Sequence, residues 1–136
     1  MSRYGITSLK YLEPQTLKAW IDASRSDHGK FAIVDVRDDD FAGGHIINCH
    51  HYPSRIFETK VHDVIEEVRG CQDIVFHCAL SQQRGPSAAL KFLRSLKDDD
   101  EFNVYVLRGG FFEWQRVYGK DKSVTLDYDS NYWKYY

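Results

Sequence analysis

Cysteine and proline are scarce in this 136-residue chain, with 3 of each, and so is net charge. The odd number of cysteines lacks a framework spacing, which excludes a disulfide-stapled domain and favours a reducing compartment. A net charge of −2 gives no reason to expect nucleic acid or an anionic membrane as a partner. No apolar run approaches the roughly 20 residues of a membrane span, and no signal peptide is recognisable. We therefore expect a cytoplasmic protein, with the nucleus left open as a second compartment.

Hydrophobic residues make up 43% of the chain, enough for the core of one domain over residues 1–136, and we expect a monomer. Beta-favouring residues up to Tyr11 predict an edge strand, and the polar stretch 24–30 predicts a loop. Apolar runs alternate with helical patterns, which favours an α/β fold with parallel strands joined by right-handed crossovers. The predicted strands include residues 31–36, 74–77 and 104–107, and the predicted helices begin near Pro14, Val61, Pro86 and Phe111.

One loop between a strand and a helix has the features of an anion site. Residues 78–84 read CALSQQR, follow the apolar run 74–76 and precede Gly85-Pro86, a favourable start for a helix. The amides of such a loop can curl inward as a nest of donors, and the helix start adds its positive dipole end. Arg84 adds a planar fork that can take two oxygens of a tetrahedral anion. The loop therefore predicts an oxyanion site.

Cys78 is the candidate nucleophile of this loop. The same positive field should favour thiolate over thiol, and the sulfur would attack the central atom of the bound anion. The predicted oxyanion-binding groups are those of Ala79, Leu80, Ser81, Gln82, Gln83 and Arg84. The alternative is a buried thiol at a strand end, with Arg84 bound to an unrelated carboxylate.

Several segments together carry a family resemblance. HCALSQQRGP at residues 77–86, IVDVR at 33–37, GGHI at 43–46 and LRGGFFEW at 107–114 resemble rhodanese-fold phosphatases of the cell-division-cycle dual-specificity kind and the related yeast-type arsenate reductases. The small single-domain fungal phosphatases are the most similar members, and the resemblance covers about residues 8–119. It implies a three-layer rhodanese-like fold, with a central, mostly parallel five-stranded sheet and helices on both faces.

The resemblance implies a protein phosphatase of tyrosine or dual specificity that works through a cysteinyl-phosphate on a phosphoprotein substrate. The sulfurtransferase rhodaneses have one residue fewer between cysteine and arginine, and a larger ring of amides suits phosphate or arsenate better. An arsenate reductase that depends on glutathione and glutaredoxin is the alternative, and a non-catalytic binding module is the third reading. No cofactor is expected. The run Cys49-His50-His51 has no second ligand pair, so no metal is expected either.

Three more residues are expected to support the loop. His77 would orient or tune the Cys78 thiolate, while Asp35, beside Arg37, would be a buried acceptor that steadies neighbouring loops rather than the catalytic acid. The run 38–40, three aspartates, is expected to be solvated charge on a loop.

Two positions depart from the cell-cycle phosphatases. Gln83 stands where they have a glutamate that has been considered a proton donor, so the general acid is unassigned among Asp38, Asp39, Asp40 and Glu113. Val36 stands where they have the cysteine of a protective disulfide. Cys49 or Cys71 could replace it only if folding brings one of them within bonding reach of Cys78.

The end of the chain lies beyond the resemblance. Residues 128–136 contain four tyrosines and Trp133, and we expect this aromatic tail to pack back on the domain, with a partner or substrate contact as the alternative. In the predicted helix 111–118, Trp114 and Val117 are expected to face inward.

Overall fold

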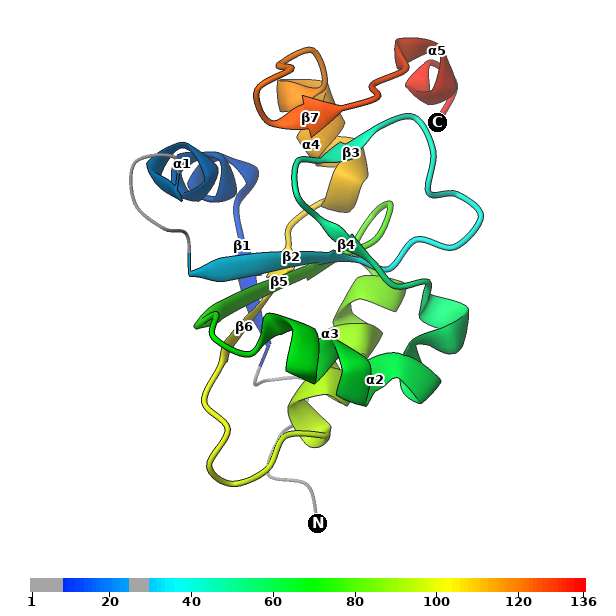
Figure 1. The fold of residues 1–136 in the computed structure, drawn as a ribbon. Coiled ribbons are helices and arrows are strands. Elements are labelled where there is room, and N and C mark those ends of the chain that lie inside the picture. Colours follow the sequence, from blue (N-terminus) through cyan, green and yellow to red (C-terminus); the bar gives the residue numbers. More distant parts are fainter. Residues whose placement is uncertain (1–8, 25–29) are drawn as a thin grey trace.

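The computed structural model describes residues 9–24 and 30–136, and its centre is a five-stranded sheet (Figure 1). Its strands lie in the order β1-β6-β5-β2-β4, and every pairing is parallel. They are β1 (Lys10–Leu12), β2 (Phe31–Asp35), β4 (His50–His51), β5 (Asp73–His77) and β6 (Asn103–Leu107). The predicted α/β class is confirmed, and β1 is the predicted edge strand. The parts of these predictions that fall on residues 1–8 and 25–29 lie outside the described residues.

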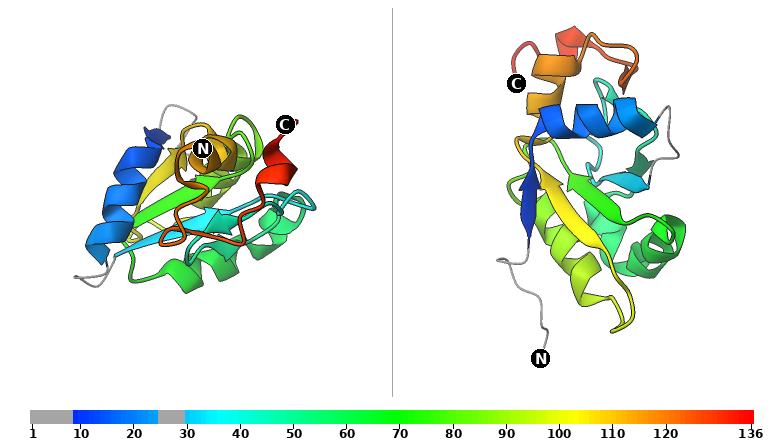
Figure 2. Two further views of the ribbon diagram at one scale, coloured as in Figure 1. Left: turned by 90° about the horizontal axis from the view of Figure 1, so that it is seen from above. Right: turned by 90° about the vertical axis from the view of Figure 1, so that its left-hand side faces the viewer.

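The three central strands are apolar on both faces because both faces are covered. Alternate residues of a strand point to opposite sides, so Val34, Phe76 and Val106 enter one core while their neighbours enter the other. The helices α2 (Ser54–Val68) and α3 (Arg84–Arg94) cover the first core, and α1 (Pro14–Ser24) and α4 (Gly110–Tyr118) cover the second. Figures 1 and 2 show these helices on the two sides of the sheet, which confirms the three-layer fold.

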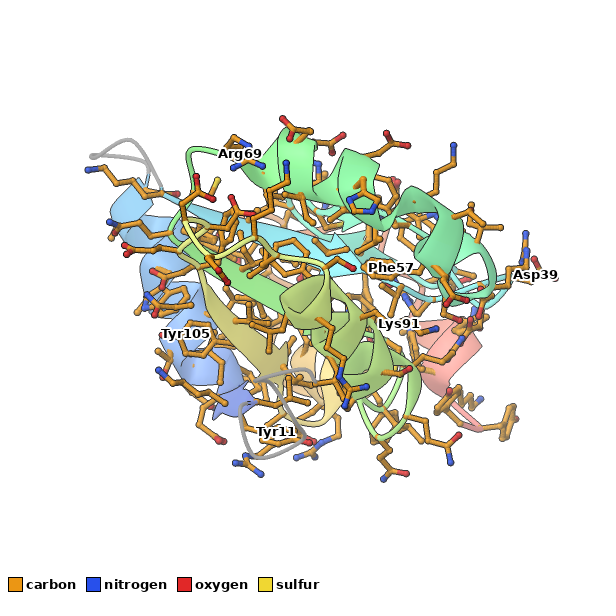
Figure 3. The ribbon with its side chains drawn as sticks, turned by 90° about the horizontal axis from the view of Figure 1, so that it is seen from below. Tyr11, Asp39, Phe57, Arg69, Lys91 and Tyr105 are labelled. Carbon is orange, nitrogen blue, oxygen red and sulfur yellow. The ribbon has the colours of Figure 1, made fainter. Side chains whose placement is uncertain are left out.

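The apolar stripes mark the buried helix faces, with one error. Val61, Val64, Ile65 and Val68 of α2 are all buried, as predicted. Figure 3 looks onto the α2–α3 side, where Phe57 lies between the two helices. In α4, Trp114 is buried, but Val117 is 45% exposed, because the buried stripe of that helix runs through Phe111, Trp114 and Gln115.

The aromatic tail packs on the layer of α1 and α4. A two-stranded antiparallel sheet joins β3 (His45–Ile46) to β7 (Thr125–Leu126), and the short helix α5 (Ser130–Trp133) follows. Trp133 is buried against Phe111 and donates its indole N–H to the Gly43 carbonyl at 2.9 Å. The predicted packing of the tail is therefore confirmed. Among the described residues, no helix has both the length and the apolar character to cross a bilayer.

Candidate active site

The CALSQQR loop lies beyond the carboxyl end of β5, where parallel sheets bind their ligands. It bends through residues 78–83 and enters α3 at Arg84. Gly85 permits this entry, because a Cβ there would lie 3.3 Å from the His77 Cα. A pocket of about 240 Å³ opens above the loop, lined by Cys78, Ala79, Leu80, Gln82, Gln83, Arg84 and Tyr136.

The sulfur of Cys78 lies at the floor of this pocket, with only 3% of the residue exposed. The Ser81 amide donates to Sγ at 3.2 Å, and the Ser81 hydroxyl accepts from the Cys78 amide at 3.4 Å. A donor aimed at the sulfur stabilises negative charge there. Ser81 adopts a φ of +56°, an uncommon backbone conformation for a residue other than glycine, and this turns its amide toward the sulfur. The Ser81 amide therefore contacts the Cys78 sulfur itself.

The backbone of the loop is held by its carbonyls, while most of its amides are free. The Cys78 carbonyl accepts from the Phe111 amide at 3.0 Å, and the Ala79 carbonyl accepts from the Phe112 amide at 2.8 Å. Within the described part of the chain, the amides of Ala79, Leu80, Gln82 and Gln83 have no acceptor. Four free amides around a buried sulfur form a suitable cradle for an oxyanion.

Two glycines that the sequence reasoning did not select hold α4 against the loop. Gly109 and Gly110 have φ values of +76° and +60°. A Cβ on Gly110 would lie 2.5 Å from the Ala79 carbonyl oxygen and 2.6 Å from that of Cys78. Only glycine allows this approach. The adjacent glycines at the start of a predicted helix were the signal in the sequence.

Arg84 does not stand free at the pocket. Its two terminal nitrogens donate to the two carboxylate oxygens of Asp40 at 2.8 and 2.6 Å, and one of them also donates to Asp38 at 3.2 Å. This bidentate bond to Arg84 holds the pKa of the Asp40 carboxyl below its usual range. An oxyanion that binds Arg84 through these same hydrogens must displace Asp40, whereas Nε and the second hydrogen of Nη2 have no acceptor among the described residues.

The prediction of solvated charge at residues 38–40 is wrong for two of the three aspartates. Asp38 accepts from the Ser54 hydroxyl at 2.6 Å and from the Arg55 amide at 3.0 Å, besides its bond to Arg84. Asp39 alone behaves as predicted, with 97% of its side chain exposed at the edge of the molecule (Figure 3). A sequence run cannot show that a cation 44 residues from Asp40 and 46 from Asp38 will bind two of three identical side chains.

Asp35 and Arg37 form a buried ion pair under the loops. Both are 0% exposed, and Arg37 Nη2 donates to Asp35 at 2.8 Å. Arg37 Nε also donates to Asp35, and Nη1 and Nη2 donate to the carbonyls of Ala42 and Gly44 at 3.1 and 2.9 Å. Burial alone would raise the pKa of Asp35, but the charges of His77 and Arg37 outweigh it and lower that pKa overall. This geometry is that of a structural acceptor.

His77 fixes the first peptide of the active loop. Its Nδ1 lies 3.1 Å from the Cys78 carbonyl, which can only accept, so Nδ1 carries the proton. Nε2 faces Asp35 at 3.6 Å and is a buried nitrogen without a hydrogen bond to any described residue. Burial lowers the pKa of His77, and the nearby Asp35 opposes that shift. His77 therefore acts on the position of Cys78 through its backbone.

None of the described thiols lies beside Cys78, and all three cysteines are free. Cys49 packs with the α1–α4 core, whereas Cys78 belongs to the α2–α3 core on the other face of the sheet. Burial raises the pKa of Cys49 to about 12. Cys71 precedes β5 and Cys78 follows it, which separates them by roughly 20 Å along an extended strand. Val36 is the side chain that lies next to Cys78, since its amide continues the ladder to the His77 carbonyl at 2.9 Å.

The other candidate residues face away from the pocket. Glu113 pairs with Arg116 at 3.0 Å. His51 contacts the Arg37 carbonyl at 2.6 Å, and His50 pairs with Glu67, so the Cys49–His51 run is divided between separate partners. Within the described residues, His, Cys, Asp and Glu nowhere gather in threes as they would around a metal ion.

A three-layer parallel sheet with a buried cysteine at the end of its central strand, inside a loop of free amides, defines an α/β domain centred on a cysteine loop. The rhodanese-like domain family matches residues 13–117. The CDC25-like phosphatase YCH1 of Saccharomyces cerevisiae is 43% identical over 98% of this chain and 100% of its own length. The chain belongs to the rhodanese-like domain family, in the branch of the Cdc25-like phosphatases and their arsenate reductase relatives.

Two further comparisons agree with this assignment. A solved structure of a yeast protein tyrosine phosphatase of the rhodanese family superimposes with a TM-score of 0.81 and 40% identity, covering 95% of this chain and 99% of that one. Arsenate reductase 2.2 of Oryza sativa subsp. japonica is 40% identical over 63% of this chain and 70% of its own length. Relatives of both kinds are named as enzymes, which makes an enzyme the expected class for this chain too.

Proposed function

We propose that this chain is a cysteine-dependent protein phosphatase of tyrosine or dual specificity. The observation that carries the proposal is the buried Cys78 sulfur. It accepts a hydrogen bond from the Ser81 amide and lies within a loop of free amides. Cys78 attacks phosphorus in line, the bond from phosphorus to the ester oxygen breaks, and a cysteinyl-phosphate forms. Water then hydrolyses this intermediate and releases inorganic phosphate.

The remaining roles follow from the contacts. Arg84 and the amides of the loop bind the equatorial oxygens, where charge builds up in the transition state. Arg84 reaches them by exchanging Asp40 for the substrate. His77 and the buried pair of Asp35 and Arg37 are positioning residues that fix the peptides around the sulfur.

The leaving group still needs a proton, and Gln83 has none to give usefully. Of the four acidic candidates, Asp40 is the one whose carboxylate binds both terminal nitrogens of Arg84. It is ionised while this bond holds, so it gains a proton only after the substrate displaces it. Aryl leaving groups, which are good ones, need this help least.

Arsenate reduction is the second candidate, supported by the rice relative and by the near-identical shape of arsenate and phosphate. The described thiols offer none to resolve a cysteine–arsenic adduct, so an external thiol such as glutathione, with glutaredoxin, would have to do so. A non-catalytic binding module is the third candidate, but the chain keeps both Cys78 and Arg84. For the phosphatase, we propose a monomer that acts on phosphoproteins in the cytoplasm.

The test compares both reactions on one preparation. Wild type, Cys78→Ser and Cys71→Ser are assayed with a chromogenic aryl phosphate, and with arsenate in the presence of glutathione and glutaredoxin. We expect aryl phosphate turnover by wild type and by Cys71→Ser, the matched control distant from the pocket, and none by Cys78→Ser. Turnover retained by Cys78→Ser would refute the role of Cys78. Turnover of arsenate alone would favour the reductase.

A further inference from the structure

Tyr136, in the aromatic tail, forms part of the wall of the oxyanion pocket. It lines the pocket together with Cys78, Leu80 and Arg84, although the loop and the tail are far apart in sequence. Tyr136 is 53% exposed, so part of its surface faces the solvent and the remainder faces the protein. Its environment includes the charges of Asp40 and Arg84, which places it beside the anion-binding groups.

The tail holds this ring in place through other aromatic side chains. The Tyr136 ring stacks on Phe112 with centroids 5.5 Å apart and planes 28° apart, and it contacts Trp133 at 4.8 Å. Trp133 is buried and bonded to the Gly43 carbonyl. Gly43 makes room for it, because a Cβ there would lie 2.5 Å from the indole nitrogen. The ring is thus positioned by packing rather than by the tail alone.

The pocket combines a polar floor with apolar sides. Its floor is the sulfur and the free amides, and its sides include the Tyr136 ring and the Leu80 side chain, which is 40% exposed. Burial raises the pKa of the Tyr136 hydroxyl, so the phenol is neutral near pH 7 and does not repel a phosphate dianion. An apolar surface beside an anion cradle suits a substrate whose phosphate is attached to an apolar group.

We propose that Tyr136 is a specificity-determining residue that selects phosphate carried on a flat aryl ring over phosphate carried on a short alkyl chain. The proposal rests on the proposed phosphatase activity and narrows its substrate class to phosphotyrosine. Two aromatic rings pair favourably beyond the area that they bury, in offset or edge-to-face arrangements. The methylene of phosphoserine and the branched carbon of phosphothreonine offer no such surface. They use the floor of the pocket and leave the Tyr136 ring in water.

The test uses one peptide prepared in two forms, with phosphotyrosine or phosphothreonine at the same position. The values of kcat/KM are measured for wild type, Tyr136→Ala, Tyr136→Phe and Tyr135→Ala. Tyr135 is the matched control, because it is 88% exposed and absent from the pocket lining. We expect Tyr136→Ala to lose about three- to tenfold on the phosphotyrosine peptide, the size of one aromatic pair, with less than about twofold change on phosphothreonine. Tyr136→Phe and Tyr135→Ala should match wild type on both peptides.

Three results would overturn the proposal. The first is no effect of Tyr136→Ala on either peptide, and the second is an equal loss on both, which would show a structural role. An equal gain on both would show that the tail obstructs the site. If wild type hydrolyses neither peptide, the proposed function fails. The role of Tyr136 is then tested separately, by calorimetric affinities of wild type and Tyr136→Ala for phenyl phosphate and for inorganic phosphate. A loss confined to phenyl phosphate supports it, and equal affinities reject it.

Discussion

Replacing Val36 by cysteine should create a disulfide with Cys78. Val36 continues the β2–β5 ladder, and both side chains enter the α2–α3 core. Directly opposed residues on neighbouring strands have Cα atoms about 4.8 Å apart, inside the range of roughly 4.4–6.8 Å that disulfides need. The substitution tests whether the nucleophile lies where the register of the sheet places it.

The magnitude follows from the loop that the bond closes. A loop of about 40 residues gives a stabilisation of about 4 kcal/mol in the chain-entropy model. Oxidised Val36→Cys should therefore unfold at a higher urea concentration than its reduced form, and it should be inactive because the nucleophile is occupied. Dithiothreitol should restore activity. Wild-type Cys78 has no described thiol in reach, so peroxide should carry it to the sulfinic acid, which dithiothreitol does not reverse.

The assay is peptide mapping by mass spectrometry after mild oxidation, with thiol counts and urea curves on the same samples. Val36→Cys with Cys78→Ser is the control, since it has the new thiol but no partner for it in the active loop. The reasoning is refuted if oxidised Val36→Cys keeps a free Cys78, or if Cys78 pairs with Cys49 or Cys71 instead.

Three further predictions concern the supports of the loop. Gly110→Ala should lower the free energy of unfolding by about 3 kcal/mol in urea titrations, because its Cβ would clash with the loop carbonyls and its φ would be strained. Gly70→Ala is the control, with an expected loss of about 1 kcal/mol, since no atom would lie within 4 Å of its Cβ. Equal losses would contradict this prediction. Asp40→Asn should free Arg84 and tighten competitive inhibition by inorganic phosphate about three- to tenfold. Weaker inhibition would instead show that Asp40 mainly orients the Arg84 guanidinium. Burial lowers the pKa of His77, so the unfolded chain takes up the proton first and the free energy of unfolding should fall as pH drops below about 6.5. His77→Gln should reduce this dependence on pH. An unchanged dependence would show that it comes from other groups.

The sequence predicted the sheet and the place of Cys78 at the end of a strand because both depend on local patterns. The apolar runs 31–36 and 74–76 have the length and composition of buried strands, and Gly85-Pro86 lies in the first turn of α3. The place of Cys78 at a strand end then follows from chain order. The roles of Cys78, Arg84 and the loop amides in chemistry stay predictions.

The contacts between distant segments could not be predicted in this way. The bond of Arg84 to Asp40 joins a helix start to a loop 44 residues away, and nothing in three consecutive aspartates distinguishes the one that will bind. Tyr136 enters the pocket because Trp133 packs over Gly43, a match of shapes that is not visible in either segment alone. Val117 was misplaced because an apolar residue in a short helix does not by itself define the buried face.

The parallel register of β2, β5 and β6 also decides on which face of the sheet the Cys78 thiol lies. Successive side chains alternate between the layers, so a slip of β5 by one residue would send the thiol of Cys78 to the opposite layer and bring the His77 ring to its place. A chain trapped in that arrangement could retain much of its secondary structure and still be inert. Correct strand pairing during folding is thus the step that places Cys78 at the floor of the pocket.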